Sequence, residues 1–311
     1  MTPSLPPPLP LRLALAPLAY YWPRQAVFDF YADVAAAPVD VVYLGETVCP
    51  RRHELRWPDW LEIAATLAAA GKEVVLSTLP LIEAEADLRL LRRIVGETPY
   101  RVEANDFGAV SLLEQRASGA PWVAGPTLNV FSPQALALLH AAGAARWVAP
   151  AEMPAAQLAD VLAAAPAGIE TELLVHGRLP LAYSARCFTA RHYNLQRDQC
   201  DYRCLAHPGG LALATREGQP FLNLNGVEVE STGVYSLLSE LPSLAAMGVG
   251  LARLAPQVDG TIALIDLFRA AVDGALDAPA AQERLQPLLP GAPCNGFWYG
   301  RPGADWVRPS A

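Results

Sequence analysis

The feature that most constrains the fold is a regular alternation of short apolar segments with longer amphipathic ones. The apolar segments predict eight β-strands: Leu11–Ala16, Val39–Gly45, Glu73–Thr78, Tyr100–Asn105, Trp122–Ala124, Arg146–Ala149, Glu170–His176 and Gly248–Leu254. Helices are predicted between them, at Pro23–Ala36, Trp57–Ala70, Glu83–Val95, Asp106–Ser118, Pro133–Ala142 and Pro154–Ala164. Apolar strands that alternate with helices are typical of a parallel sheet covered by helices. Eight such units predict an α/β fold, a (β/α)8 TIM-barrel-like domain.

The alternation is interrupted after the seventh strand. Residues 178–235 form an insertion, with an extended piece at Pro220–Val229 and a turn at Asn225-Gly226. Helices are predicted again at Leu237–Ala246, before the eighth strand, and at Ile262–Ala275, after it. We therefore predict three regions: a disordered Pro-rich tail at 1–10, a barrel-like domain at 11–280 that includes the insertion, and a Pro/Gly/Trp-rich C-terminal tail at 281–311.

Composition and charge argue against nucleic acid as a partner and against a membrane-spanning or secreted protein. The net charge of −8 argues against nucleic acid as the main partner. No apolar run reaches the ~18 residues that a spanning helix needs. The first apolar stretch, Leu11–Ala19, has no Lys or Arg before it, unlike a secretory signal. We therefore expect a cytoplasmic protein, in which cysteines serve as metal ligands or in catalysis rather than in disulfides.

Three of the five cysteines lie in one short stretch. Twelve residues separate Cys187 from Cys200, and three separate Cys200 from Cys204. If the last two belong to one helix, their sulfurs lie on one face, one turn apart. Their neighbours are mostly polar, which argues against the role of a buried, small hydrophobic residue. A fourth cysteine would complete a four-thiolate shell, suited to an iron–sulfur cluster or to structural zinc.

The predicted barrel favours Cys49 as the fourth ligand. Barrel enzymes carry their sites on the loops that follow the strands. Cys49 lies four residues past the end of the second predicted strand, and Cys187 follows the seventh, so both belong to the same face. The sequence does not place Cys294, which lies in the C-terminal tail.

Other polar residues offer catalytic roles, each with a plainer alternative. Arg51 and Arg52 could bind a carboxylate in bidentate fashion, or lie on a solvated turn. Glu172 and His176 could form an acid–base pair at the mouth of a strand, or Glu172 could be a hydrogen-bonded residue of the barrel interior. Asp106 is predicted to cap a helix. No His-Glu-x-x-His, Gly-x-Ser-x-Gly or phosphate-loop motif is present. The sequence therefore does not identify the catalytic residues.

Several segments together resemble a known family. Glu172…His176-Gly177, followed by Tyr183-Ser184…Cys187, resembles the signature of the collagenase-like peptidase family. Val41–Gly45 is similar to the early strand of that family, and Leu222–Asn225 to the start of a later block. The resemblance covers nearly the whole chain and implies a (β/α) barrel.

Departures from the family pattern are informative. Pro180 stands where the signature has a cysteine, and Ala185 where it has a glycine. The Lys-Ile-Glu-Gly-Arg segment of the family is replaced by Ala252-Arg253-Leu254-Ala255-Pro256. These differences argue against peptidase activity. They favour the subgroup of accessory proteins that serve oxygen-independent ubiquinone biosynthesis.

This resemblance implies a cofactor, a partner and a role. The cofactor is a [4Fe–4S] cluster, and the positions that match its ligands are Cys49, Cys187, Cys200 and Cys204. The partner is a paralogous subunit, joined in a heterodimer, and the role is hydroxylation of the quinone ring without dioxygen. Two alternatives stay open: a peptidase-like hydrolase whose four cysteines hold structural zinc, and a non-catalytic subunit that only stabilises its paralogue.

Overall fold

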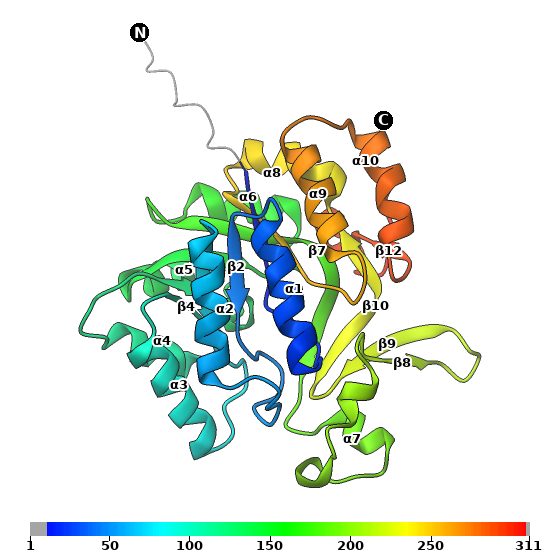
Figure 1. Cartoon of the computed structure of the whole chain (residues 1–311). Helices are drawn as coiled ribbons and strands as arrows, with labels where there is room; N and C mark the ends of the chain where they lie inside the picture. Colours follow the sequence, from blue (N-terminus) through cyan, green and yellow to red (C-terminus); the bar gives the residue numbers. More distant parts are fainter. Residues whose placement is uncertain (1–10, 309–311) are drawn as a thin grey trace.

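The structure, a computed structural model, describes residues 11–308, and the predicted tail at 1–10 lies outside them (Figure 1). Eight parallel strands form a closed barrel: β1 (Arg12–Leu15), β2 (Val41–Leu44), β3 (Glu73–Ser77), β4 (Arg101–Ala104), β5 (Trp122–Ala124), β6 (Ala144–Ala149), β7 (Glu170–Tyr183) and β11 (Leu251–Leu254). Each strand pairs with the next, and β11 closes the barrel by pairing with both β1 and β7. The predicted (β/α)8 barrel is therefore confirmed.

Helices surround the barrel. They are α1 (Arg24–Ala36), α2 (Trp57–Ala69), α3 (Glu85–Glu97), α4 (Phe107–Glu114), α5 (Pro133–Ala141), α6 (Ala155–Ala163), α8 (Leu241–Met247), α9 (Thr261–Val272) and α10 (Ala278–Leu285). Asp106 caps α4 as predicted, because its side chain accepts a hydrogen bond of 2.6 Å from the amide of Gly108. Among residues 11–308, no helix combines the length and the apolar character needed to cross a bilayer.

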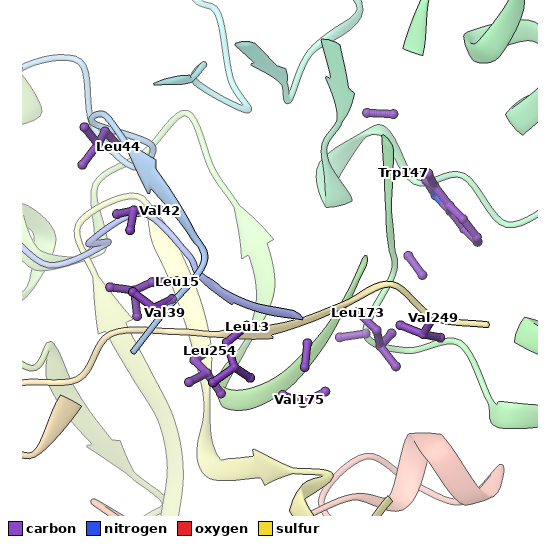
Figure 2. Packing of buried hydrophobic residues seen from close by; sticks show 14 of the residues in the cluster. Leu13, Leu15, Val39, Val42, Leu44, Trp147, Leu173, Val175, Val249 and Leu254 are labelled. Atoms are coloured by element: carbon purple, nitrogen blue, oxygen red, sulfur yellow. The ribbon is translucent and has the colours of Figure 1, made fainter. Parts of the chain in front are cut away.

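Alternate residues of each strand face opposite layers of the core. Leu13 and Leu15 of β1 point outward and pack in the cluster between strands and helices, where Figure 2 shows them near Leu254 of β11. Ala14, between them, belongs to a small cluster inside the barrel. This period of two is the pattern expected of a strand buried on both sides.

The barrel interior also holds a network of charges. Arg253 donates to Glu172 at 2.6 Å and to Glu103 at 2.7 Å, and all three side chains are almost fully buried. Tyr43 donates to the other oxygen of Glu172 at 2.5 Å, and Arg146 donates to the Tyr43 hydroxyl at 3.2 Å. Paired and hydrogen-bonded charges are the form in which ions are tolerated in an interior.

The insertion begins within β7, which runs well beyond the barrel. Its second half pairs antiparallel with β10 (Glu228–Ser236), and β10 pairs with β9 (Pro220–Asn225), which pairs with β8 (Leu211–Ala214). The predicted turn at Asn225-Gly226 joins β9 to β10. The short helix α7 (Phe188–His192) and the β8–β9 hairpin extend from the same end of the barrel (Figure 1).

The C-terminal segment packs back on the barrel. Helix α10 runs across the predicted boundary at residue 281. The strand β12 (Pro293–Cys294) then pairs with Val234 and Tyr235 of β10, and Trp298 is buried in the outer core. The Pro/Gly/Trp-rich segment up to residue 308 is therefore part of the folded domain.

Candidate metal centre

Cys49 is held by a tight loop after β2. The Glu46 carboxylate accepts hydrogen bonds from the amides of Val48 at 2.9 Å and of Cys49 at 3.0 Å. Gly45, at φ +125°, starts the loop where an added Cβ would lie 2.9 Å from the Ser77 carbonyl oxygen. Only glycine adopts that backbone without strain, so the loop depends on it.

Cys187 lies at the start of α7, after the end of β7. Its sulfur accepts a hydrogen bond of 3.4 Å from the amide of Ala190. The amide of Phe188 donates to the carbonyl of Gly226 at 2.7 Å, which fixes the segment against the β9–β10 turn. Cys49 and Cys187 pack in one apolar cluster with Val48 and Val227. The two loops that sequence reasoning put on one face therefore meet.

Cys200 and Cys204 do not belong to one helix, so the condition for placing their sulfurs one helical turn apart is not met. Cys200 follows a 3-10 turn at Arg197–Gln199, and Cys204 lies in another at Arg203–Ala206. Asp201 and Tyr202, between the two turns, have φ of 48° and 51°. This left-handed backbone cannot continue a right-handed helix.

The cysteine-bearing segment is tied to the Cys49 loop. Arg51 donates a hydrogen bond of 2.9 Å to the carbonyl oxygen of Asp198. Arg197 donates to the carbonyl of Ala185 at 2.8 Å and forms an ion pair with Glu83. Arg51, a catalytic candidate from the sequence, thus contacts the segment between Cys187 and Cys200.

Cys187 and Cys200 lie close enough to Cys204 to affect its ionisation, and Arg52 acts on both Cys204 and Cys49. Burial raises the pKa of Cys204, the charge of Arg52 lowers it, and Cys187 and Cys200 raise it further. Burial also raises the pKa of Cys49, which Arg52 and Arg197 lower. All four are free thiols. Because metals bind thiolates, the arginines favour the ionised form that such a ligand needs.

Three arginines around the thiols have unsatisfied donors. The Nε atoms of Arg51, Arg52 and Arg197 are buried and have no hydrogen-bond partner among the described residues. Buried donors are normally paired, so each orphaned donor requires an explanation. Hydrogen bonds to sulfur are a common feature around iron–sulfur clusters. The donors and the four thiols together fit an anionic, sulfur-rich group.

The grouping of the thiols bears on whether they suit a single metal ion or an iron–sulfur cluster. Within residues 11–308, no three His, Cys, Asp or Glu side chains are grouped tightly enough to hold a single metal ion. A structural zinc site needs its sulfurs about 2.3 Å from one ion. An iron–sulfur cluster is a larger body that takes a thiolate at each corner. Among the described residues, the thiols are therefore not grouped as the ligands of one ion.

Cys294 has different surroundings. It pairs through β12 with Tyr235 of β10, and its sulfur would lie 3.1 Å from a Cβ added at Gly233. Burial raises the pKa of Cys294 to about 11, which keeps the thiol neutral. Its setting is that of a packed core residue.

Of the two alternatives for Glu172 and His176, the structure shows a hydrogen-bonded Glu172 in the barrel interior, and the two side chains do not form an acid–base pair. Glu172 is held inside the barrel by Arg253 and Tyr43. A register shift lies between the pairs Leu174–Arg253 and His176–Leu254, so Val175 is skipped and His176 faces outward. There it packs edge-on against Phe268 of α9, with ring centres 5.6 Å apart. Burial lowers the pKa of His176 to about 4, so the ring is neutral.

Sequence reasoning missed a cavity at the carboxyl ends of the strands. The cavity has a volume of about 410 Å³, and Arg253, Arg178, Glu228 and Glu230 contribute to its lining. The two glutamates alternate on β10, after the Asn225-Gly226 turn. Charged residues that recur with a period of two in an insertion strand are the pattern that would have drawn attention to them.

Comparison with known proteins identifies the family. The family model described as peptidase family U32 matches residues 28–308. The chain belongs to peptidase family U32. Among solved structures, this U32 chain is similar to the U32 peptidase Mk0906, with 10% identity over 83% of this chain and 97% of the other, at a TM-score of 0.45.

Two further solved structures are similar to the U32 chain at the level of the fold. One is the spore cortex-lytic enzyme SleL of Bacillus megaterium QM B1551, with 11% identity over 84% of this chain and 76% of the other, at a TM-score of 0.39. The other is the phospho-2-dehydro-3-deoxyheptonate aldolase of Thermotoga maritima, with 13% identity over 90% and 70%, at a TM-score of 0.36.

Proposed function

We propose that this U32 chain is the [4Fe–4S] cluster-binding subunit of an oxygen-independent hydroxylation system in ubiquinone biosynthesis. It would be a cytoplasmic protein of the UbiV type, acting in a heterodimer with a UbiU-type paralogue on a ubiquinone precursor. Three observations support the proposal: Cys49 packs in one cluster with Cys187, Cys204 interacts with Cys187 and Cys200, and the Nε donors of Arg51, Arg52 and Arg197 are orphaned.

In this proposal, the four cysteines hold the cluster, which supplies one-electron transfer when bound. The chain's own residues prepare the site. Arg52 and Arg197 place positive charge and donors next to the thiols, which lowers the cost of ionising them. Arg51 ties the Cys49 loop to the segment before Cys200, which keeps the two halves of the site together.

Cluster content tests the ligand set. The protein would be purified without oxygen and reconstituted, and iron and acid-labile sulfide would be measured. We expect Cys49→Ser, Cys187→Ser, Cys200→Ser and Cys204→Ser each to lose most of the cluster, and the matched control Cys294→Ser to keep it. Stoichiometric zinc without sulfide would instead support a peptidase-like hydrolase with a structural zinc site.

The pathway needs a separate test. A deletion strain would be grown with and without oxygen, and ubiquinone and its unhydroxylated precursors would be measured. We expect ubiquinone to be lost only without oxygen. Rescue by the Cys200→Ser, Cys204→Ser double variant would keep the protein in the pathway as a stabilising partner but remove the cluster from its role.

A further inference from the structure

Five prolines line the cavity at the mouth of the barrel: Pro17, Pro80, Pro126, Pro150 and Pro180. The first four follow β1, β3, β5 and β6 within three residues, and Pro180 lies in β7. Proline has a fixed φ and no backbone N–H. At these five positions the walls are therefore stiff and apolar and carry no backbone donor that needs a partner. Walls that do not rearrange reduce the entropic cost of binding.

The chemistry of the prolines favours a ligand with a flat face. Proline rings pack against aromatic faces in the recognition of proline-rich peptides, and the same contact works in reverse. The volume of about 410 Å³ is in the range of small-molecule sites. The side chains of Leu174 and Leu181 complete the apolar lining.

Glu230 is a buried polar group of the cavity lining with a free hydrogen-bonding position. The Oε2 atom of Glu230 accepts from Asn223 at 2.7 Å and from the Tyr20 hydroxyl at 3.2 Å. Its Oε1 atom has no hydrogen-bond partner in residues 11–308. Both oxygens of the neighbouring Glu228 are occupied, by Tyr183 at 2.8 Å and by Asn225 at 2.9 Å. Glu152 also lines the cavity but is exposed, so Glu230 is the buried carboxyl group with an atom left for a ligand.

The charge balance of the lining favours an uncharged ligand. Arg253 is neutralised by Glu103 and Glu172. Arg178 donates to the backbone carbonyls of Ser231 at 2.9 Å and of Thr232 at 2.5 Å, and its charge, opposite to that of Glu228, acts on Glu230. Burial and the charge of Glu228 raise the pKa of Glu230 to about 8, so Glu230 carries a proton at pH 7 and can donate it to an oxygen.

We infer that the cavity binds the flat face of an uncharged aromatic or quinonoid ring between its prolines, with an oxygen substituent of the ring hydrogen-bonded to Glu230. The inference rests on the proposed function in taking this ring as the substrate class. Ala19 lies in the lining of the cavity and also packs against the cluster of Val48, Cys49 and Val227. A bound ring would therefore lie next to the proposed metal centre.

Three matched probes test the inference on the full chain. Acetophenone is flat and uncharged and has a carbonyl acceptor, benzoate is flat but anionic, and cyclohexyl methyl ketone is uncharged but not flat. Their dissociation constants would be measured by ligand-observed NMR. We expect acetophenone to bind about tenfold more tightly than either other probe, a difference of about 1.4 kcal/mol. Equal binding of the three, or a preference for benzoate, would overturn the inference.

Variants locate the binding. Ala182→Trp adds a large side chain to the lining, and we expect it to abolish acetophenone binding. Ala214→Trp is the matched control, because Ala214 is also exposed in the insertion but outside the cavity.

In the wild type, acetophenone binding should weaken as the pH rises from 7 to 9.5, since Glu230 loses its proton. Glu230→Gln keeps a donor and should make binding independent of pH. Unchanged binding in Ala182→Trp, or a pH effect that persists in Glu230→Gln, would count against the assigned site.

The Cys200→Ser, Cys204→Ser double variant separates this inference from the proposed function. We expect it to bind acetophenone like the wild type while lacking iron. If the wild type bound the ring but took up no cluster on reconstitution, the cavity site would be retained and the metal centre rejected. A wild type that takes up the cluster but does not bind the ring would support the metal centre and reject the cavity site.

Discussion

The Arg52 guanidinium donates a hydrogen bond of 2.6 Å to the side-chain oxygen of Asn225. Asn225 in turn donates to Glu228 at 2.9 Å, and Glu228 lines the cavity. On its other side, Arg52 lowers the pKa of Cys204 by its charge and a hydrogen bond. The cavity and the thiols are therefore connected through three buried polar side chains. A change of charge at one site acts on the other through Arg52, in surroundings where water screens little.

Arg52 is predicted to be essential for stability. Its side chain is buried, and the nearest carboxylate, Glu46, lies 3.5 Å away. Arg52→Met leaves Glu46 without its partner, and we expect a loss of about 3–5 kcal/mol in the free energy of unfolding. Urea unfolding without oxygen would measure it. The control Arg24→Met breaks an exposed ion pair with Asp59, and we expect it to change the unfolding free energy far less than Arg52→Met does.

A second substitution tests the cause of that loss. If the cost comes from the unpaired Glu46, then Glu46→Gln should recover part of the stability of Arg52→Met. A double variant no more stable than Arg52→Met alone would show that most of the loss comes from the broken hydrogen bonds to Ala19 and Asn225.

Gly45 is predicted to hold the Cys49 loop in place. Gly45→Ala meets the Ser77 carbonyl oxygen at 2.9 Å and also forces a side chain onto φ +125°. Gly71→Ala is the matched control, with φ +81° and no atom within 4 Å of the added Cβ. We expect the control to cost about 1 kcal/mol. Gly45→Ala should cost roughly twice that or more. Equal losses, measured by thermal or urea unfolding, would contradict the predicted clash.

The barrel was predictable from the sequence because parallel strands buried on both sides have a strong local pattern. The meeting of the Cys49 and Cys187 loops followed from the same pattern, since loops after barrel strands share a face. The orientation of His176 was not predictable, because it depends on a register shift between β7 and β11. A shift of one residue exchanges the two faces of a strand, and no local pattern records it.

Features of the insertion were harder to predict. The conformation between Cys200 and Cys204 depends on two left-handed residues, Asp201 and Tyr202, that any local helix propensity would miss. The cavity depends on contacts between distant segments, such as Tyr20 with Glu230. Contacts over such separations are set by the tertiary fold.

Glu230 is predicted to make stability depend on pH. Its pKa is raised to about 8 by burial and by Glu228, whereas an unfolded glutamate titrates near 4.3. Between these values the unfolded state loses the proton and the folded state keeps it, so stability falls as the pH rises from about 4 to about 8. Glu230→Gln removes this loss. We expect it to be more stable than the wild type by on the order of 3 kcal/mol at pH 8 and by much less at pH 4.5.

A matched control separates this effect from general charge removal. Glu62→Gln also removes one negative charge, at an exposed position of α2. Its difference from the wild type should change little between pH 4.5 and 8. If Glu230→Gln behaved like Glu62→Gln in urea unfolding across this range, the protonated state of Glu230 would be wrong.

His176 is predicted to make the free energy of unfolding decrease as the pH falls, the opposite of the effect of Glu230. Burial lowers its pKa to about 4, whereas an unfolded histidine titrates near 6.5. As the pH falls from 6.5 to 4, the unfolded state gains a proton that the folded state cannot accept, so stability is full above pH 6.5 and decreases below it. His176→Gln removes this titration. The difference in unfolding free energy between wild type and variant should therefore shift by about 3 kcal/mol in favour of the variant between pH 7 and pH 4.

His140→Gln provides the comparison, since His140 is only partly buried on α5 and donates a hydrogen bond of 2.9 Å to the Ala144 carbonyl oxygen. A His176→Gln difference that stays constant with pH would mean that the ring is protonated in the folded protein, despite its burial against Phe268.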